Sequence, residues 1–334
     1  MKTIKELLME QRERHGWKEY HNPKDLAVAL NIETSELLEN FLWKENKDLN
    51  AFLEVFEESA RQQAKLVDEK IKNGTAGRLA GMVIGLKDNM CYKGHKVSAA
   101  SKILFNFESL FTGTAVERLI AQDAIIIGRL NCDEFAMGSS NENSAFGGVK
   151  NPIDLDRVPG GSSGGSAAAL AAGFTGLEAG SDIGGSIRNP AHFCGVYGHK
   201  PTYGIIPMTG HELVSNVPDA DLAVCGPLAR SAEDVRQALD IMAGPAEREA
   251  AGWKLDLPEA DFKNLKDLKI AVWANDEMAP VSHEIEERAI QVGETLTKLG
   301  ATVSFDARPK FDPETGNINY QLLLHFRLPM IVIL

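Results

Sequence analysis

Two glycine-rich stretches carry serines in a pattern that could form a nucleophilic site. The first, RVPGGSSGGSAAALAAG (157–173), has the composition of a flexible linker, but a helix-forming alanine run follows its glycines directly. The second, LEAGSDIGGSIRNP (177–190), predicts a short strand, a tight loop at 183–185 and a helix opened by Ser186. Successive N–H groups in such a loop can converge on one anion, and glycine lets the backbone approach a ligand. The pattern therefore indicates an oxyanion hole with Ser186 beside it as the nucleophile.

A serine nucleophile requires a base, and the sequence offers two candidates. His192 lies shortly after Ser186, but no orienting acid stands at a recognisable position, so a structural role fits it better. Lys87 in GLKDN ends an apolar strand, where an α/β sheet often presents functional groups. Burial behind MVIGL would lower its pKa from about 10.4 toward the neutral range. Asp88 should point to the opposite side, because successive side chains on a strand alternate.

These motifs resemble those of one enzyme family. PGGSSGGSAAALAAG followed by GSDIGGSIRNPAHFCG is similar to the amidase signature, and GLKDN resembles that family's lysine motif. The resemblance implies a Ser–cisSer–Lys triad with Lys87 as base, Ser162 as the bridging serine in a cis peptide conformation, and Ser186 as nucleophile. It also implies a supporting hydrogen bond from Ser163. The oxyanion hole would be formed, with the Ser186 N–H, by Ile183, Gly184 and Gly185.

The serine pair at 162–163 also fits a different motif. Gly161 to Gly165 match the G-x-S-x-G nucleophile elbow of α/β-hydrolases, which requires a strand immediately before it. The preceding NPIDLDRVP is polar and contains prolines, so we expect no strand there. The glycines are instead expected to shape a catalytic loop.

The stretch EFAMGSSNENSAFGG (134–148) resembles the loop that lines the substrate pocket in this family. A plain polar turn is the alternative interpretation. The residues expected in the pocket wall are Met137, Gly138, Ser139 and Ser140.

Two branches of the family remain open from the sequence. Residues 47–147, with VSAAS and NCDEFAMGSSNENSAFG, look most like the A subunit of bacterial glutamyl-tRNA(Gln) amidotransferase, which releases ammonia from glutamine and passes it to a partner subunit. Residues 148–325, with GHKPTYGIIPMTGH, look more like a stand-alone bacterial amidase acting on a small-molecule amide. The resemblance favours a serine hydrolase that forms an acyl-enzyme on linear carboxamides. If the chain is an amidotransferase subunit, we expect it to bind partner subunits. A homo-oligomer is the alternative assembly.

The N-terminus carries a second resemblance. HGWKEYHNPKDLAVALNIETSELLENFLWKE resembles the start of a MazG-like nucleotide pyrophosphatase, and Glu33, Glu36 and Glu39 match its first set of magnesium ligands. No second set follows, so an amphipathic helical cap is the simpler interpretation, and we expect neither a metal site nor a cofactor. The chain is thus divided into a helical segment at 1–46 and an amidase signature domain at 47–334 that is incomplete at its C-terminus. A non-catalytic helical scaffold with a remnant amidase domain is a third functional hypothesis.

Apolar periodicity predicts an α/β protein with a mixed β-sheet core flanked by helices, the amidase signature fold. We expect buried strands in LAGMVIGLKDN and AIIIGRLN with the helix TAVERLIAQD between them. A helical stretch at 49–74 would end at Gly74 as C-cap, and Ser231 with Asp234 would open another helix. A strand in LKIAVW, a helix after Ser282 and a strand in ATVSFDA would follow.

Composition places the chain among ordinary globular proteins. It has 334 residues, of which 44% are hydrophobic and 25% charged, and its net charge of −12 disfavours direct binding of nucleic acid or an anionic membrane. The four cysteines suit neither a disulfide scaffold nor a zinc site. The charged N-terminus lacks a signal sequence, and the terminal LPMIVIL is too short to span a bilayer. These features predict a reduced cytoplasmic enzyme.

Overall fold

The structure is a computed structural model that describes residues 46–211, 222–258 and 262–332. The MazG-like segment with Glu33, Glu36 and Glu39 lies outside these residues. The chain divides into two compact units, Met1–Leu255 and Asp256–Leu334. Each unit is described by itself below.

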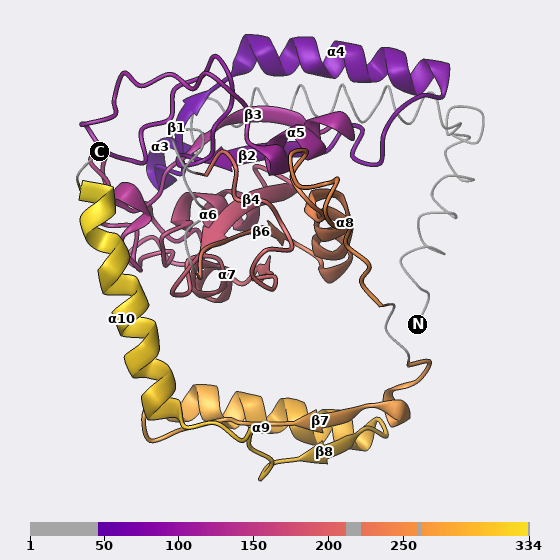
Figure 1. The fold of residues 1–334 in the computed structure, drawn as a ribbon, viewed down its shortest axis with the longest axis vertical. Coiled ribbons are helices and arrows are strands. Elements are labelled where there is room, and N and C mark those ends of the chain that lie inside the picture. Colours follow the sequence, from indigo (N-terminus) through magenta and orange to yellow (C-terminus); the bar gives the residue numbers. More distant parts are fainter. Residues whose placement is uncertain (1–45, 212–221, 259–261, 333–334) are drawn as a thin grey trace. The chain divides into compact units, whose positions relative to one another are not determined.

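The first unit holds the glycine-rich motifs and consists of alternating helices and short strands (Figure 1). Its strands are β1 (Phe52–Val55), β2 (Val83–Lys87), β3 (Ile125–Leu130), β4 (Leu177–Asp182), β5 (Tyr197–Gly198) and β6 (Val224–Ala229). Its helices are α3 (Asn46–Leu49), α4 (Glu57–Asn73), α5 (Thr114–Ala121), α6 (Gly164–Ala171), α7 (Arg188–Cys194) and α8 (Ala232–Met242), with the short 3₁₀ turn η3 (Glu134–Ala136).

The six strands form one mixed sheet in the order β1-β3-β2-β4-β6-β5. The central strands β3, β2 and β4 run parallel, whereas β1, β6 and β5 pair antiparallel with their neighbours. This topology confirms the α/β class with a mixed sheet flanked by helices. The parallel strands β2 and β4 lie side by side, so their carboxyl ends meet at one edge, and Lys87 and Asp182 end these two strands.

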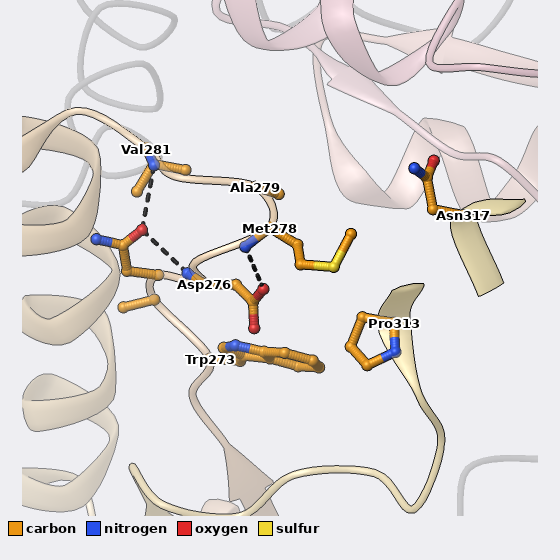
Figure 2. A pocket seen from close by; sticks show the side chains of 9 residues that line it. Trp273, Asp276, Met278, Ala279, Val281, Pro313 and Asn317 are labelled. Carbon is orange, nitrogen blue, oxygen red and sulfur yellow. Dashed lines mark hydrogen bonds between the residues drawn. The ribbon is translucent and has the colours of Figure 1, made fainter. Parts of the chain in front are cut away.

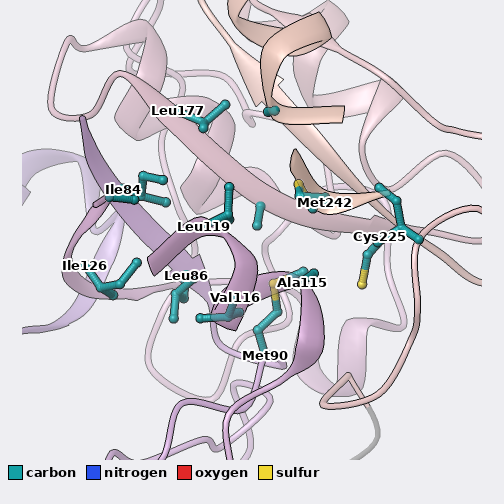
Figure 3. Packing of buried hydrophobic residues seen from close by; sticks show 14 of the residues in the cluster. Ile84, Leu86, Met90, Ala115, Val116, Leu119, Ile126, Leu177, Cys225 and Met242 are labelled. Carbon is teal, nitrogen blue, oxygen red and sulfur yellow. The ribbon is translucent and has the colours of Figure 1, made fainter. Parts of the chain in front are cut away.

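Alternating residues of the strands fill cores on the two faces of the sheet. Ile84 and Leu86 of β2 and Ile126 of β3 pack with α5 and α8 in one buried cluster (Figure 3). Ile125 and Ile127 of β3 belong to a second cluster with residues of α4 and α6. The sheet is therefore covered on both faces. Because Lys87 alternates with Leu86, it faces away from the first cluster.

The predicted helix at 49–74 is wrong in its first part. Residues Phe52–Val55 form the edge strand β1, which pairs antiparallel with β3, and only the part from Glu57 is helical. Phe52 is buried in the sheet's second core, so tertiary packing overrides the local helical pattern. The predicted end of the helix is confirmed, because Gly74 takes a left-handed conformation with φ of 69° and donates to the carbonyl of Ile71.

The predicted elements around β2 and β3 and the predicted start of α8 are confirmed. LAGMVIGLKDN contains β2, AIIIGRLN contains β3, and the intervening helix is α5. Helix α8 is capped at its N-terminus by the Ser231 hydroxyl, which accepts from the Asp234 N–H at 3.1 Å. No strand precedes the serine pair at 162–163, as expected, because the described residues from 131 to 161 contain turns, η3, irregular backbone and one isolated bridge between Asn151 and Asp154.

The second unit contains a small parallel sheet of β7 (Lys269–Ala271) and β8 (Thr302–Ser304), as LKIAVW and ATVSFDA predict. Helix α9 (His283–Lys298) connects the strands and packs on them through Gly293, which lies against Phe305. The turn η4 (Leu265–Asp267) precedes β7, and helix α10 (Pro313–Val332) follows β8. Within the described part of the chain, no helix is long and apolar enough to cross a membrane.

Candidate active site

Lys87 is one of the largest fully buried side chains among the described residues and lies at the end of β2. Its Nζ donates to the Ser162 hydroxyl at 2.7 Å and to the Ser181 hydroxyl at 3.1 Å. Burial lowers the pKa of Lys87 from 10.5 to about 8, against the opposing charges of nearby groups that include Asp133 and Asp182. About a tenth of this lysine is therefore neutral at pH 7.

Asp88 points away from Lys87, as strand alternation predicts. Its carboxylate accepts from the Arg129 guanidinium at 2.7 Å and from the Ser98 N–H at 3.0 Å. The Ala100 N–H donates to it at 2.7 Å. Asp88 is thus paired with its own cation, and its charge does not oppose the lowered pKa of Lys87.

Ser162 is fully buried immediately before α6, and the peptide bond between Gly161 and Ser162 is cis. This is the conformation that the family resemblance implies for the bridging serine. Gly160 has φ of 78°, a conformation that favours glycine. The supposed linker is therefore a compact loop that delivers the Ser162 hydroxyl to Lys87.

Ser186 lies in the turn between β4 and α7, and the helix begins two residues later than predicted, at Arg188. Its carbonyl accepts from the Ser163 N–H at 3.1 Å, which joins the two glycine-rich loops. Ser186 is partly exposed, and its hydroxyl has no hydrogen-bond partner among the described residues. It is therefore accessible to a substrate.

Asp182 organises the turn that carries Ser186. Its carboxylate accepts from the N–H groups of Gly185 at 2.9 Å and Ile187 at 3.0 Å. Arg188 donates two side-chain hydrogen bonds to it, at 2.9 and 3.1 Å. Burial alone would raise the pKa of Asp182, but the Arg188 and backbone hydrogen bonds outweigh burial and lower it. The carboxylate is therefore charged and holds the turn through ionic hydrogen bonds.

The oxyanion-hole prediction needs one correction. The Gly185 N–H is already donated to Asp182, so it is not available to an oxyanion. The φ of 121° shows that Gly185 shapes the turn instead. Within the part of the chain that the structure describes, the N–H groups of Ile183, Gly184 and Ser186 have no protein acceptor. These three donors form the candidate oxyanion hole.

The supporting hydrogen bond expected from Ser163 comes from its backbone N–H and not from its hydroxyl. The hydroxyl is buried and has no partner among the described residues. It lies against Gly180 of β4, where an added Cβ would be only 3.1 Å from the hydroxyl oxygen. Ser163 thus contributes to the packing of α6 on the sheet and to the contact with the Ser186 carbonyl.

The predicted pocket residues belong to the segment 137–141, called the substrate loop below, which is mostly exposed. This loop lies against the segment 157–163 that carries the serine pair, called the serine loop below. Met137 is 41% exposed, Gly138 and Ser139 are exposed, and Ser140 is partly buried. The backbone of Ser139 closely approaches Gly161. The loop is therefore adjacent to the Lys87–Ser162 pair, as a pocket wall requires.

The hydrogen-bond partners of Lys87 Nζ are Ser162 and Ser181, and His192 is not one of them. It is exposed on α7 and its ring contacts Phe193 edge-on. Another histidine joins the lysine network instead: His211 Nε2 lies 2.9 Å from Asn89 Nδ2, which donates to Ser181 at 3.2 Å. Burial, aided by the charge of Lys87, lowers the pKa of His211 to about 3. His211 is therefore neutral.

A cavity of about 420 Å³ lies elsewhere, within the second unit (Figure 2). Trp273, Met278 and Pro313 line it, and Asp276 accepts from the Met278 N–H at 2.9 Å. It contains none of the predicted catalytic residues. No group of three or more His, Cys, Asp or Glu side chains among the described residues could hold a metal ion. The four cysteines, all described, are buried and form no disulfide.

Comparison with known proteins assigns the chain to a class. The family model for amidases matches residues 36–323, so the chain belongs to the amidase family. The A subunit of glutamyl-tRNA(Gln) amidotransferase from Geobacillus thermodenitrificans is 47% identical over 258 residues, which cover 76% of this chain and 52% of the relative. The chain thus spans about half the length of the curated relatives it matches.

Solved structures agree with this assignment. The A subunit of glutamyl-tRNA(Gln) amidotransferase from Thermotoga maritima matches with a TM-score of 0.66 and 33% identity, covering 82% of this chain and 57% of that chain. A bacterial aryl acylamidase of the amidase signature family matches with a TM-score of 0.70 and 26% identity, covering 83% and 57%. Both comparisons support the mixed α/β fold and membership of the amidase family.

Proposed function

We propose that this chain cleaves a carboxamide C–N bond through a triad of Ser186, Ser162 and Lys87. The observation that carries the proposal is the 2.7 Å hydrogen bond from the buried Lys87 Nζ to Ser162, next to the turn that presents Ser186. With a pKa of about 8, about a tenth of Lys87 is neutral at pH 7. This neutral fraction can accept a proton. At the ordinary lysine pKa of 10.5, almost all of Lys87 would be protonated at pH 7 and could not act as a base.

The reaction follows from the roles proposed for Lys87, Ser162 and Ser186. Neutral Lys87 takes a proton from Ser162 as Ser162 takes one from Ser186, and the Ser186 oxygen attacks the amide carbonyl carbon. The carbonyl oxygen becomes an anion that the N–H groups of Ile183, Gly184 and Ser186 stabilise. The relayed proton then goes to the leaving nitrogen as the C–N bond breaks. Water releases the acyl group from Ser186 by the reverse relay.

The relatives favour glutamine as the amide. The curated relative reported above is an A subunit of glutamyl-tRNA(Gln) amidotransferase, at 47% identity, whereas the aryl acylamidase is 26% identical. We infer that the chain supplies ammonia from glutamine to a partner subunit. This interpretation takes precedence over a stand-alone amidase, which the acylamidase likeness supports as second candidate. The MazG-like resemblance of the N-terminus stays a prediction from sequence.

Ammonia release tests the proposal. The chain is assayed with glutamine and with a panel of simple amides, alone and after coexpression with amidotransferase partner subunits. Copurification with a partner and glutaminase activity that requires it support the amidotransferase function. Activity on simple amides without a partner supports the stand-alone enzyme.

Two serine variants provide the control. Ser186→Ala should abolish ammonia release, whereas Ser166→Ala should retain it, because Ser166 is buried in α6 without a hydrogen-bond partner among the described residues. Equal activity of Ser186→Ala and the wild type would contradict the triad. Absence of activity together with no covalent labelling of Ser186 would favour the non-catalytic scaffold.

A further inference from the structure

Asp133 is a fully buried carboxylate three residues beyond the end of β3. The backbone N–H of Asn141 donates to both of its oxygens, at 3.0 and 3.1 Å. The backbone N–H of Asp133 donates to the Ser162 carbonyl at 3.3 Å. One residue therefore contacts the substrate loop through its side chain and the serine loop through its backbone.

The Asp133 carboxyl also occupies the space that two glycines leave open. A Cβ at Gly138, in the substrate loop, would collide with the carboxyl group, and a Cβ at Gly161, before the cis peptide bond, would collide with its Oδ2. Both glycines are therefore in close contact with the same carboxylate. The two loops approach each other across Asp133.

Asn141 extends this connection to α6. Its side chain is fully buried and fills the space beside Gly164, the first residue of that helix. Its φ of 64° is left-handed, so the backbone reverses at the point where Asp133 holds its N–H. The substrate loop is thus fixed at 141 between Asp133 and the helix that follows Ser162.

The Asp133 carboxylate acts on Lys87 electrostatically. Burial raises the pKa of Asp133, and the Asn141 hydrogen bond and the charge of Lys87 oppose that effect. In return, the charge of Asp133 raises the pKa of Lys87 against the larger effect of burial. The other titratable groups that interact electrostatically with Lys87 are Cys132, Asp182, Cys225 and His211.

We propose that Asp133 is a positioning residue that fixes the substrate loop 137–141 to the Gly161–Ser162 segment, so that the bound amide and the proton relay keep one relative position. The inference rests on the proposed function, because it assigns Lys87 and Ser162 to the relay. It adds a residue that holds the relay and the pocket wall together. Asp133 itself need not touch the substrate.

Covalent labelling of Ser186 by a fluorophosphonate, followed from pH 6 to 10, tests the inference in the whole chain. Asp133→Asn keeps the shape of the side chain but removes its charge and one of its two acceptor oxygens. Asp133→Ala removes both acceptor oxygens and the side-chain contacts with Gly138 and Gly161, but keeps the backbone hydrogen bond to the Ser162 carbonyl. Asp156→Asn is the matched control, because it makes the same aspartate-to-asparagine change at an exposed position before the serine pair.

The variants have distinct expected results. Asp133→Asn should lower the maximal labelling rate about tenfold, the effect of losing one hydrogen bond to a charged group. It should also move the midpoint of the pH profile to lower pH, because Lys87 loses a negative neighbour. Asp133→Ala should lower the rate about 10²-fold, as a displacement of about 1 Å does. Asp156→Asn should match the wild type in both rate and midpoint.

Other outcomes overturn the inference. Wild-type rate and midpoint in Asp133→Asn would show that Asp133 does not act on the relay, while the proposed function would stand. A rate loss that follows the unfolded fraction measured by circular dichroism, with an unshifted midpoint, would reduce Asp133 to a folding role. A wild-type chain that is not labelled at Ser186 would contradict the proposed function and the inference together.

Discussion

The lowered pKa of Lys87 makes a quantitative prediction for the pH dependence of acylation. If neutral Lys87 is the base, the rate of Ser186 labelling follows the fraction of the lysine that is unprotonated. With a pKa of about 8, that fraction is about one-eleventh at pH 7 and about ten-elevenths at pH 9. The labelling rate should therefore rise about tenfold between these pH values and level off above them.

Substitutions at Lys87 separate the charge from the proton transfer. Lys87→Arg keeps a cation but cannot give up its proton in this range, and Lys87→Ala removes the acceptor. Both should lower the labelling rate at pH 9 by about 10²–10⁴-fold, which is the usual contribution of general base catalysis. Lys70→Arg is the control, because Lys70 of α4 pairs with Asp123 and takes no part in the site.

The assay is the pseudo-first-order rate of fluorophosphonate labelling from pH 6 to 10 for the wild type and these variants. Near-wild-type labelling of Lys87→Arg at pH 7 would refute the reasoning and require another base. A wild-type profile whose midpoint lies near the ordinary lysine value of 10.5 would show that burial does not prepare Lys87 for catalysis.

Two further carboxylates give stability predictions, each measured by chemical denaturation at several pH values. Asp182→Asn should lower the free energy of unfolding at pH 7 by about 1–3 kcal/mol, because Gly185 and Ile187 lose a charged acceptor. The pKa of Asp182 in the folded state is lowered, so the stability difference between wild type and variant is fully present above the ordinary pKa of 3.8. It should vanish as the pH falls through the folded-state pKa. A stability difference that is the same at every pH would contradict a charged Asp182 as the acceptor in this turn. Burial raises the pKa of Glu178 well above 4.5, so the wild type should lose stability relative to Glu178→Gln as the pH rises above 4.5, and parallel curves would contradict the raised pKa.

The sequence predicts most elements around the site, because their apolar periodicity matches their burial. The runs at β2 and β3 are apolar on both faces, as expected for strands between two helical layers. Strand β1 is the exception. Its four residues belong to a continuous helical pattern, and only the partner strand β3, which follows about 70 residues later, makes them extended. Such a long-range pairing leaves no local signal.

The catalytic residues are predicted from motifs, whereas the residues that hold them are not. Lys87, Ser162 and Ser186 occur in glycine-rich or strand-ending patterns with recognisable spacing. Ser181 and Asp182 lie in the same motif as Ser186, so their nearness in the sequence is a usable signal. Asp133 is one of many acidic residues, and its place between the substrate loop and the serine loop follows from tertiary contacts alone.

Identification of the modified residue tests the central claim most directly. The wild-type chain is treated with a fluorophosphonate at about pH 9, where Lys87 is mostly neutral, then digested and analysed by tandem mass spectrometry. The account predicts a single modified serine, Ser186, and no adduct in a Ser186→Ala variant that remains folded by circular dichroism. An adduct on Ser162 or Ser163, or its persistence in Ser186→Ala, would contradict the assignment of the nucleophile.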